Sequence, residues 1–253
     1  MKRNSFLMQL LLIVLSFNLN GQEPTAKQII EKADDKFTGE KSSVSVMSMT
    51  IVRPAWERTV EFKSWTEGSE KSLTLITGPA SEKGQSFLKR GNEMWSWNPS
   101  ISRLIKLPPS MMSQGWMGSD YSNDDILKES SIVRDYHHKI VGEETLEGRL
   151  CYKIRLEAKE NAAVIWGHQV RWIDKEDFIF LKAEMYDVEG YLIRTELAGD
   201  VQLMDGRKIP TRIELIPEEE EGHKTILKIR EIRFNEDIPD SFFSQQNMKR
   251  VRS

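Results

Sequence analysis

The feature that most constrains the fold is an alternation of apolar and polar residues, which begins after Gly39 and continues almost to the end of the chain. A period of two residues is typical of β-strands with one buried face. The expected strands are residues 44–52, 58–65, 72–77, 86–89, 94–97, 103–107, 136–142, 149–157, 164–174, 178–187, 191–197, 201–204, 208–216 and 224–234. A sheet this long must curl, close or split. We therefore predict a mainly β (α+β) fold with a strongly curved antiparallel sheet, or incomplete β-barrel, although a β-sandwich would show the same periodicity.

Two segments depart from this alternation. Residues 24–37 have the spacing of an amphipathic helix, and Thr25 and Gln28 form a capping-box pattern at its start. Residues 108–131 form an insert between strands, and within it Ser122 can cap a second helix. If the sheet curls, its concave face must be filled by the first helix, by this insert or by a ligand.

The insert begins with large apolar side chains that follow no regular spacing. Methionine suits surfaces that accept ligands of varying shape, so these residues either line a ligand site or belong to the core. The candidate ligand-contacting residues of the insert are Met111, Met112, Trp116, Met117 and Tyr121. Trp95 and Trp97 lie on one side of an expected strand, and they are further candidates for which core packing is the more common role.

The first residues predict export. Lys2 and Arg3 precede an apolar run at residues 6–17, and Gly21 ends the polar stretch that follows. This layout is typical of a cleaved secretory signal, and the run is too short to span a membrane. We therefore expect a signal peptide at residues 1–21 and a single domain at residues 22–253. The lone cysteine, Cys151, lies far from the cleavage site in an expected strand, which indicates a small core residue and no lipid anchor.

Composition and motifs argue against several classes of function. A formal net charge of −3 disfavours nucleic acid as a partner. The chain has no G-x-S-x-G elbow, P-loop or H-E-x-x-H motif, so we predict no enzyme activity, no cofactor and no metal site. The adjacent His137 and His138 would point to opposite faces of a strand. Residues 120–124 have the alternating oxygens of a calcium loop, but the glycine and glutamate that such a loop needs are replaced by Asp125 and Ser131, and helix capping explains the same residues.

Several motifs occur in an order typical of one family. The most distinctive is residues 116–126, Trp-Met-Gly-Ser-Asp-Tyr-Ser-Asn-Asp-Asp-Ile. The others are Trp95-Ser96-Trp97-Asn98-Pro99, residues 103–108, Gly142-Glu143-Glu144 with residues 148–152, residues 170–174 and Ile209-Pro210-Thr211. Together they cover most of the chain after the signal, and the sequence resembles the LolA-like family of bacterial outer-membrane lipoprotein-sorting proteins.

The resemblance implies a LolA/LolB-like incomplete barrel, in which helices form a lid over a hydrophobic cavity. It also implies a periplasmic carrier of lipid or lipoprotein acyl chains, with an inner-membrane transporter as donor and an outer-membrane protein as acceptor. Carriers of this fold have an arginine that closes the cavity, and Arg53 is the residue to test first for that role. One alternative is a non-catalytic accessory protein of an envelope transport or assembly machine. An exported hydrolase is the least favoured.

Export gives the first testable prediction. Because residues 1–21 have the layout of a signal peptide, the mature protein should begin near Gln22 and be recovered from the periplasm. N-terminal sequencing of the purified protein, with cell fractionation, measures both. A retained Met1 in a cytosolic protein would contradict the predicted location and the carrier role together.

Overall fold

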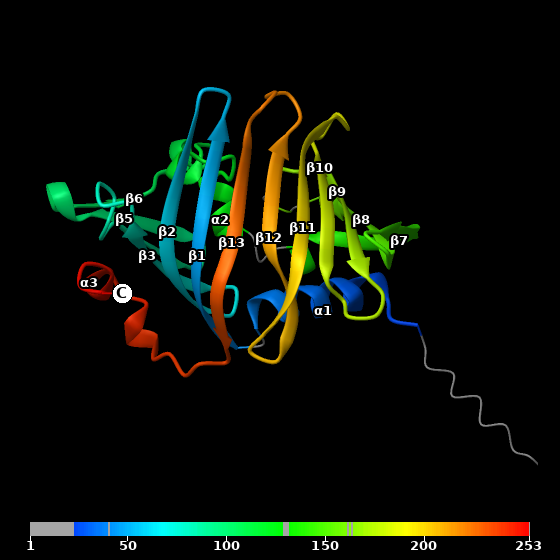
Figure 1. Cartoon of the computed structure of the whole chain (residues 1–253), viewed down its shortest axis with the longest axis horizontal. Coiled ribbons are helices and arrows are strands. Elements are labelled where there is room, and N and C mark those ends of the chain that lie inside the picture. The colour runs from blue at the N-terminus through cyan, green and yellow to red at the C-terminus, as the bar shows by residue number, and fades with distance from the viewer. Residues whose placement is uncertain (1–22, 40, 129–131, 161, 163, 253) are drawn as a thin grey trace, which may run out of the picture.

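The computed structural model describes residues 23–39, 41–128, 132–160, 162 and 164–252. Within these ranges, thirteen strands form one sheet in the order β6-β5-β4-β3-β2-β1-β13-β12-β11-β10-β9-β8-β7 (Figure 1). Every neighbouring pair for which a register is defined is antiparallel. The expected signal peptide lies outside the described residues.

The strands agree closely with the segments expected from the alternation. Those of the first half are β1 (Ser42–Arg53), β2 (Trp56–Glu67), β3 (Lys71–Gly78), β4 (Ser86–Arg90), β5 (Glu93–Asn98) and β6 (Arg103–Lys106). Those of the second half are β7 (Tyr136–Leu146), β8 (Arg149–Ala158), β9 (His168–Asp174), β10 (Phe180–Tyr186), β11 (Leu192–Met204), β12 (Arg207–Pro217) and β13 (Lys224–Phe234). The helices are α1 (Ala26–Thr38), α2 (Asn123–Lys128) and α3 (Gln245–Met248), with 3-10 turns η1 (Pro99–Ile101), η2 (Pro109–Met111), η3 (Trp116–Gly118) and η5 (Asp240–Phe242).

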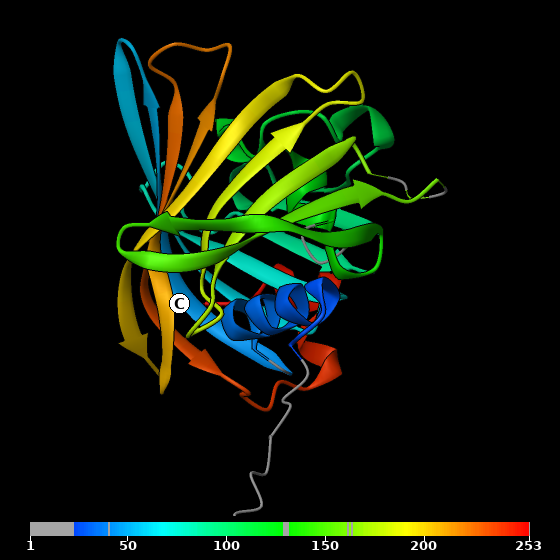
Figure 2. The same cartoon turned by 90° about the vertical axis from the view of Figure 1, so that its right-hand side faces the viewer.

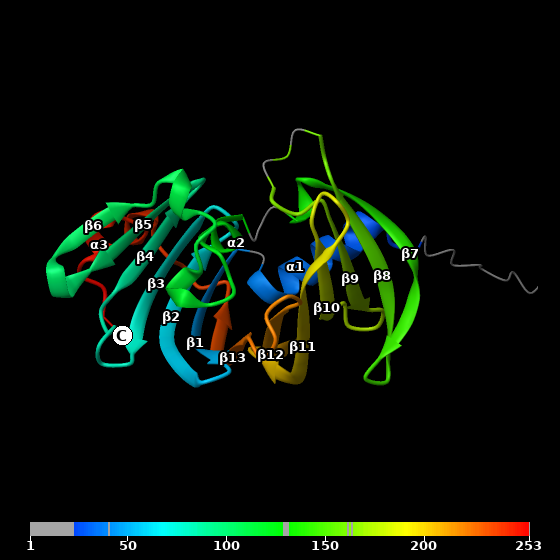
Figure 3. The same cartoon turned by 90° about the horizontal axis from the view of Figure 1, so that it is seen from above.

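The sheet curves strongly but does not close. Strands β6 and β7 are its two edges. Seen from above, the two halves of the sheet bend toward the same side, and α1 and α2 lie between them (Figure 3). Figure 2 shows α1 lying across one opening of the curve. The predicted curved, unclosed antiparallel sheet is confirmed. The helices in the described part of the chain are all too short or too polar to cross a membrane.

Helix α1 forms as its sequence predicts. The Thr25 hydroxyl accepts a hydrogen bond from the backbone N–H of Gln28, and the Gln28 side chain accepts one from the N–H of Thr25, so the capping box is confirmed. Ile29, Ile30 and Ala33 form the buried face. This face packs against the inner side of the sheet, where α1 contacts β7, β9 and β12.

The first half of the sheet is covered on both faces. Because side chains alternate along a strand, Phe87 and Met94 point to the inner face, which the insert covers, whereas Leu88 points to the outer face. Residues 238–251 cover that outer face, and Phe243 is fully buried there. The Ser86 hydroxyl donates to the backbone carbonyl of Met248 at 2.6 Å.

One expected boundary is wrong. The expected strands 191–197 and 201–204 are a single strand, β11. Asp200 adopts a positive φ of 52°, and the register with β12 passes from Gly199–Arg212 directly to Val201–Pro210. The register is unchanged across this position, so the irregular backbone at Asp200 interrupts the pairing locally without ending the strand. Cys151 is fully buried as predicted, and burial raises the pKa of its thiol to about 11.

The outer cover gives a stability prediction. Replacing Phe243 with Ala should lower the free energy of unfolding by about 3–5 kcal/mol, because the side chain is fully buried and the surroundings relax only partly. Urea unfolding of the purified variant measures this. The control is Ile101→Ala, where the side chain is 64% exposed and the change should be within about 0.5 kcal/mol. Equal effects at the two positions would contradict the role of the C-terminal segment as a structural cover.

Candidate functional site

A cavity of about 730 Å³ lies between the inner face of the sheet, α1 and the insert with α2. Its volume is within the range of small-molecule sites. The apolar part of its wall includes Ile30, Ala33, Phe37, Met47, Met49, Phe62, Trp116, Ile126, Tyr136, Val164, Ile173, Phe180, Met185, Ile213, Leu227, Ile229 and Ile232. Both helices and both halves of the sheet thus contribute to one apolar site.

Two of the candidates from the sequence, Trp116 and Tyr121, line this cavity. Trp116 is only 4% exposed, and its ring makes edge contacts with the rings of Phe62 at 5.6 Å and Phe87 at 5.5 Å. Trp116 therefore belongs both to the core and to the cavity wall. The sequence left core packing and ligand contact open as alternatives, and for this residue they are compatible.

The methionines of the insert lie behind this wall. Met112 and Met117 are partly buried against the core cluster around Trp116, and Met111 is partly exposed. None of the three is among the residues that line the cavity. Met117 adopts a positive φ of 53° within the short turn η3.

Trp95 and Trp97 are on the opposite face of the sheet. They pack with the C-terminal segment, and the Lys249 ammonium lies 5.3 Å from the centre of the Trp97 ring. They follow Met94, which faces inward, so the pleat of β5 directs them outward. The structure does not bring them to the cavity. Spacing along a strand shows that two residues share a face but not which face it is.

Arg53, the candidate for a closing arginine, holds the insert at its rim. Its guanidinium donates two hydrogen bonds to the Asp120 carboxylate, at 2.9 and 3.2 Å, and the side chains are 14% and 7% exposed. The Thr225 hydroxyl also donates to Asp120, at 2.6 Å. Arg53 does not line the cavity. Its position at the end of β1 ties the first residues of the 116–126 motif to the sheet.

The helix start in this motif is confirmed. The Ser122 hydroxyl accepts from the backbone N–H of Asp125 at 3.0 Å, and the Asp125 carboxylate accepts from the N–H of Ser122 at 2.8 Å. Asp125 also receives two parallel hydrogen bonds from Arg194 of β11, at 2.7 and 2.8 Å. Both charged residues line the cavity. α2 is thereby fastened to the second half of the sheet.

The pair between Arg194 and Asp125 is deeply buried. The two side chains are 8% and 10% exposed, and the Arg194 guanidinium lies 4.4 Å from the centre of the Trp166 ring. Burial alone would raise the pKa of Asp125, but the hydrogen bonds and charge of Arg194, with the bonds from Ser122, hold it below its ordinary value. Sequence reasoning missed Arg194 because it carries no local motif and is far from Asp125 along the chain.

A third arginine anchors the same insert from β2. The Arg58 guanidinium donates to the backbone carbonyl of Met117 and pairs with Glu82. With Arg53 and Arg194, cationic side chains from three strands thus hold the insert over the inner face.

The cavity also contains a titratable carboxyl group on α1. Asp34 lines the wall, and its burial raises its pKa to about 6, although the positive charge of Arg171 acts in the opposite direction. The charge of this wall therefore changes between pH 5 and pH 7.

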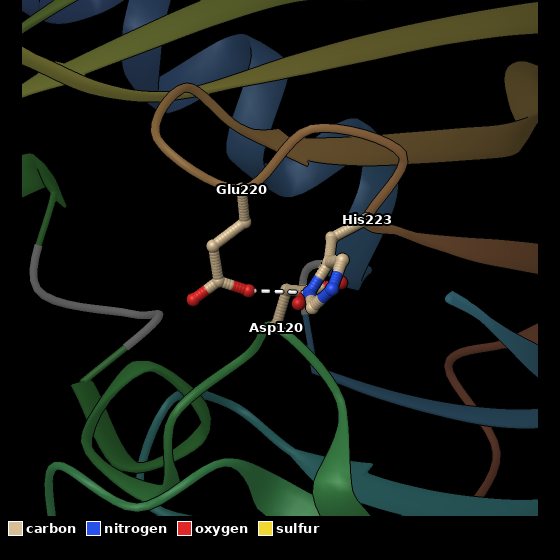
Figure 4. Close-up of side chains that lie close together, drawn as sticks. All are labelled: Asp120, Glu220 and His223. Atoms are coloured by element: carbon tan, nitrogen blue, oxygen red, sulfur yellow. Dashed lines mark ion pairs between the residues drawn. The ribbon is translucent and has the colours of Figure 1, made fainter. Parts of the chain in front are cut away.

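At the rim, one histidine approaches two carboxylates. Possible ligand atoms of Asp120, Glu220 and His223 all lie within 4.8 Å of one another (Figure 4). His223 Nδ1 is 2.5 Å from Glu220. The Asp120 oxygens already accept hydrogen bonds from Arg53 and Thr225, and the nearby guanidinium opposes a second cation. We interpret the group as a polar contact between the insert and the β12–β13 hairpin.

The geometry defines a class: an open, curved antiparallel sheet with helices laid over an apolar cavity. The model of a family described as an uncharacterized protein matches residues 68–250, which is more than half of the chain, so the chain belongs to that family. Among curated proteins, no sequence matches this one.

Solved structures identify the fold as LolA-like. A LolA superfamily protein from Nitrosomonas europaea is 28% identical, with a TM-score of 0.74 over 88% of this chain and 99% of that one. An outer membrane lipoprotein-sorting protein domain from Vibrio parahaemolyticus is 21% identical, with a TM-score of 0.76 over 89% and 98%. A DUF1329 family protein from Desulfovibrio piger is 24% identical, with a TM-score of 0.78 over 88% and 99%.

These similarities confirm the predicted relation to LolA-like proteins. The significance of the 116–126 motif for the family stays a prediction.

The anchoring of α2 gives the next prediction. Asp125→Ala should lower the free energy of unfolding by about 3–5 kcal/mol, because it leaves the buried guanidinium of Arg194 without its carboxylate. Chemical unfolding followed by tryptophan fluorescence measures this. The control is Asp240→Ala, which removes an exposed partner of Lys71 and should change stability very little. If the two variants were equally stable, the buried pair would not be what holds α2.

Proposed function

We propose that this protein is a periplasmic carrier that holds lipid, or the acyl chains of a lipoprotein, in the cavity beneath α1 and α2. The observation that carries the proposal is the cavity of about 730 Å³ with an extensive apolar wall. Each buried methylene contributes about 0.8 kcal/mol, so one long acyl chain is sufficient to form a water-soluble complex. Trp116 and Tyr121 are the ligand contacts among the candidates from the sequence.

The proposed pathway rests on the expected periplasmic location. The similarity to an outer membrane lipoprotein-sorting protein domain supports an envelope role, and the expected signal peptide supports export. A carrier that uses no nucleotide or cofactor can transport its ligand in one direction only if its donor and its acceptor differ in affinity. We therefore propose a donor at the inner membrane and an acceptor at the outer membrane.

Lipid extraction from gently purified protein tests the proposal. A carrier should yield one class of lipid in near-stoichiometric amount by mass spectrometry. A protein that neither retains lipid nor binds a fluorescent fatty acid would instead support the alternative of a non-catalytic accessory protein in an envelope machine.

A variant that fills the cavity gives a sharper prediction. Leu227 lines the cavity from β13, so Leu227→Trp should place an indole in the space for the acyl chain. We expect displacement assays with a fluorescent fatty acid to show at least about tenfold weaker binding, with a melting temperature close to that of the wild type. The control is Leu203→Trp at a site that is 72% exposed, which should bind normally. Unchanged binding in Leu227→Trp would place the ligand elsewhere.

A further inference from the structure

One end of the cavity is lined by hydroxyl groups rather than by apolar side chains. The strand register aligns six of them in two adjacent rows across β1, β2 and β3. The rows are Ser43, Thr66 and Ser72, and then Ser45, Ser64 and Thr74, and all six line the cavity. The next row along the strands is apolar, with Met47 opposite Phe62. The cavity wall therefore changes from polar to apolar within one step of the pleat.

These hydroxyls are not fully satisfied within the protein. Ser43 and Thr66 share a hydrogen bond at 2.7 Å, and Ser64 and Thr74 share one at 3.0 Å. Ser45 is only 5% exposed, lines the cavity, and makes no side-chain hydrogen bond within the described residues. Its hydroxyl is therefore available to a molecule bound in the cavity.

A positive charge lies at the end of the first row. Lys89 of β4 is opposite Ser72, is only 7% exposed, lines the cavity, and donates to the backbone carbonyl of Ser69 at 2.8 Å. Among the acids that line the cavity, Asp34 is in the electrostatic range of Arg171, and Asp125 and Glu196 are in that of Arg194. The hydroxyl rows are thus the part of the wall where hydrogen-bond donors and an ammonium group come together.

We infer that the six hydroxyls and Lys89, here called the hydroxyl shelf, bind the anionic oxygen headgroup of an amphiphile, either a carboxylate or a phosphate. Its acyl chain lies over Met47, Phe62 and the apolar wall beyond them. This inference rests on the proposed carrier function and adds the chemical class of the headgroup. Hydroxyl and ammonium donors are suited to such oxygens, because hydrogen bonds to an ionised acceptor are the stronger ones.

Ligands that share a chain but differ in headgroup test the shelf. Binding of palmitic acid is compared with that of hexadecanol, and binding of palmitoyl lysophosphatidic acid with that of monopalmitoylglycerol, by displacement of a fluorescent fatty acid from the full mature chain. We expect at least one anionic ligand to bind about tenfold more tightly than its neutral counterpart. A preference in the first pair identifies a carboxylate, and one in the second pair identifies a phosphate.

Two variants locate the effect. Ser45→Ala and Lys89→Met should each remove most of the preference for the anion while binding of the neutral ligand is retained, which also shows that the variants are folded. The control is Ser48→Ala, because Ser48 is buried on the same strand but does not line the cavity; its preference should be unchanged.

The possible failures are distinguishable. Equal affinities for charged and neutral ligands would overturn the inference and leave the carrier function intact. A preference that persists in both shelf variants would overturn the assignment to these residues. If wild-type protein bound none of the four ligands, the proposed function would fail, and the inference with it.

Discussion

The curvature of an unclosed sheet is the constraint on which the rest of this structure depends. Thirteen strands that bend toward one side create a concave face that their own side chains do not fill. Exposure of that face to water would remove the burial of apolar side chains that stabilises the sheet. Helix α1 and the insert cover it from two directions, and the space that remains is the cavity. The cavity is therefore a consequence of how the sheet curves and is covered, and not a separate pocket added to a finished core.

The insert needs more than apolar contact to stay in this position. It is short, and its α-helix, Asn123–Lys128, is too brief to be stable alone. Arg53 and Arg194 reach it from opposite sides, each through a carboxylate of the 116–126 motif. Buried ion pairs contribute little net stability compared with apolar packing, but they are severely destabilising when one partner is removed. The two ion pairs therefore determine the position of the insert over the sheet more than they increase the stability of the protein.

The limits of sequence reasoning follow the range of the interactions involved. The capping box of Thr25 and Gln28 and that of Ser122 and Asp125 each lie within one helical turn, and the sequence predicts them correctly. Strand positions were also predictable, because alternation is local, although the continuation of β11 through Asp200 was not. The face that Trp95 and Trp97 occupy was not predictable, because it depends on the residues 238–251 that return to cover it. The role of Arg194 was not predictable for the same reason, since its partner Asp125 is 69 residues away along the chain.

A wall that changes from apolar to polar has consequences for cargo selection. The free energy of burying an acyl chain depends on its apolar area and hardly at all on the group to which the chain is attached. A uniformly apolar cavity would therefore accept any lipid of suitable length. Discrimination requires groups whose hydrogen bonds one headgroup satisfies and another leaves unpaired. Ser45 and Lys89 are positioned to impose that cost on a neutral ligand. Affinity would then come from Met47, Phe62 and the wall beyond them, and selectivity from the hydroxyl shelf, so that the two properties can change independently.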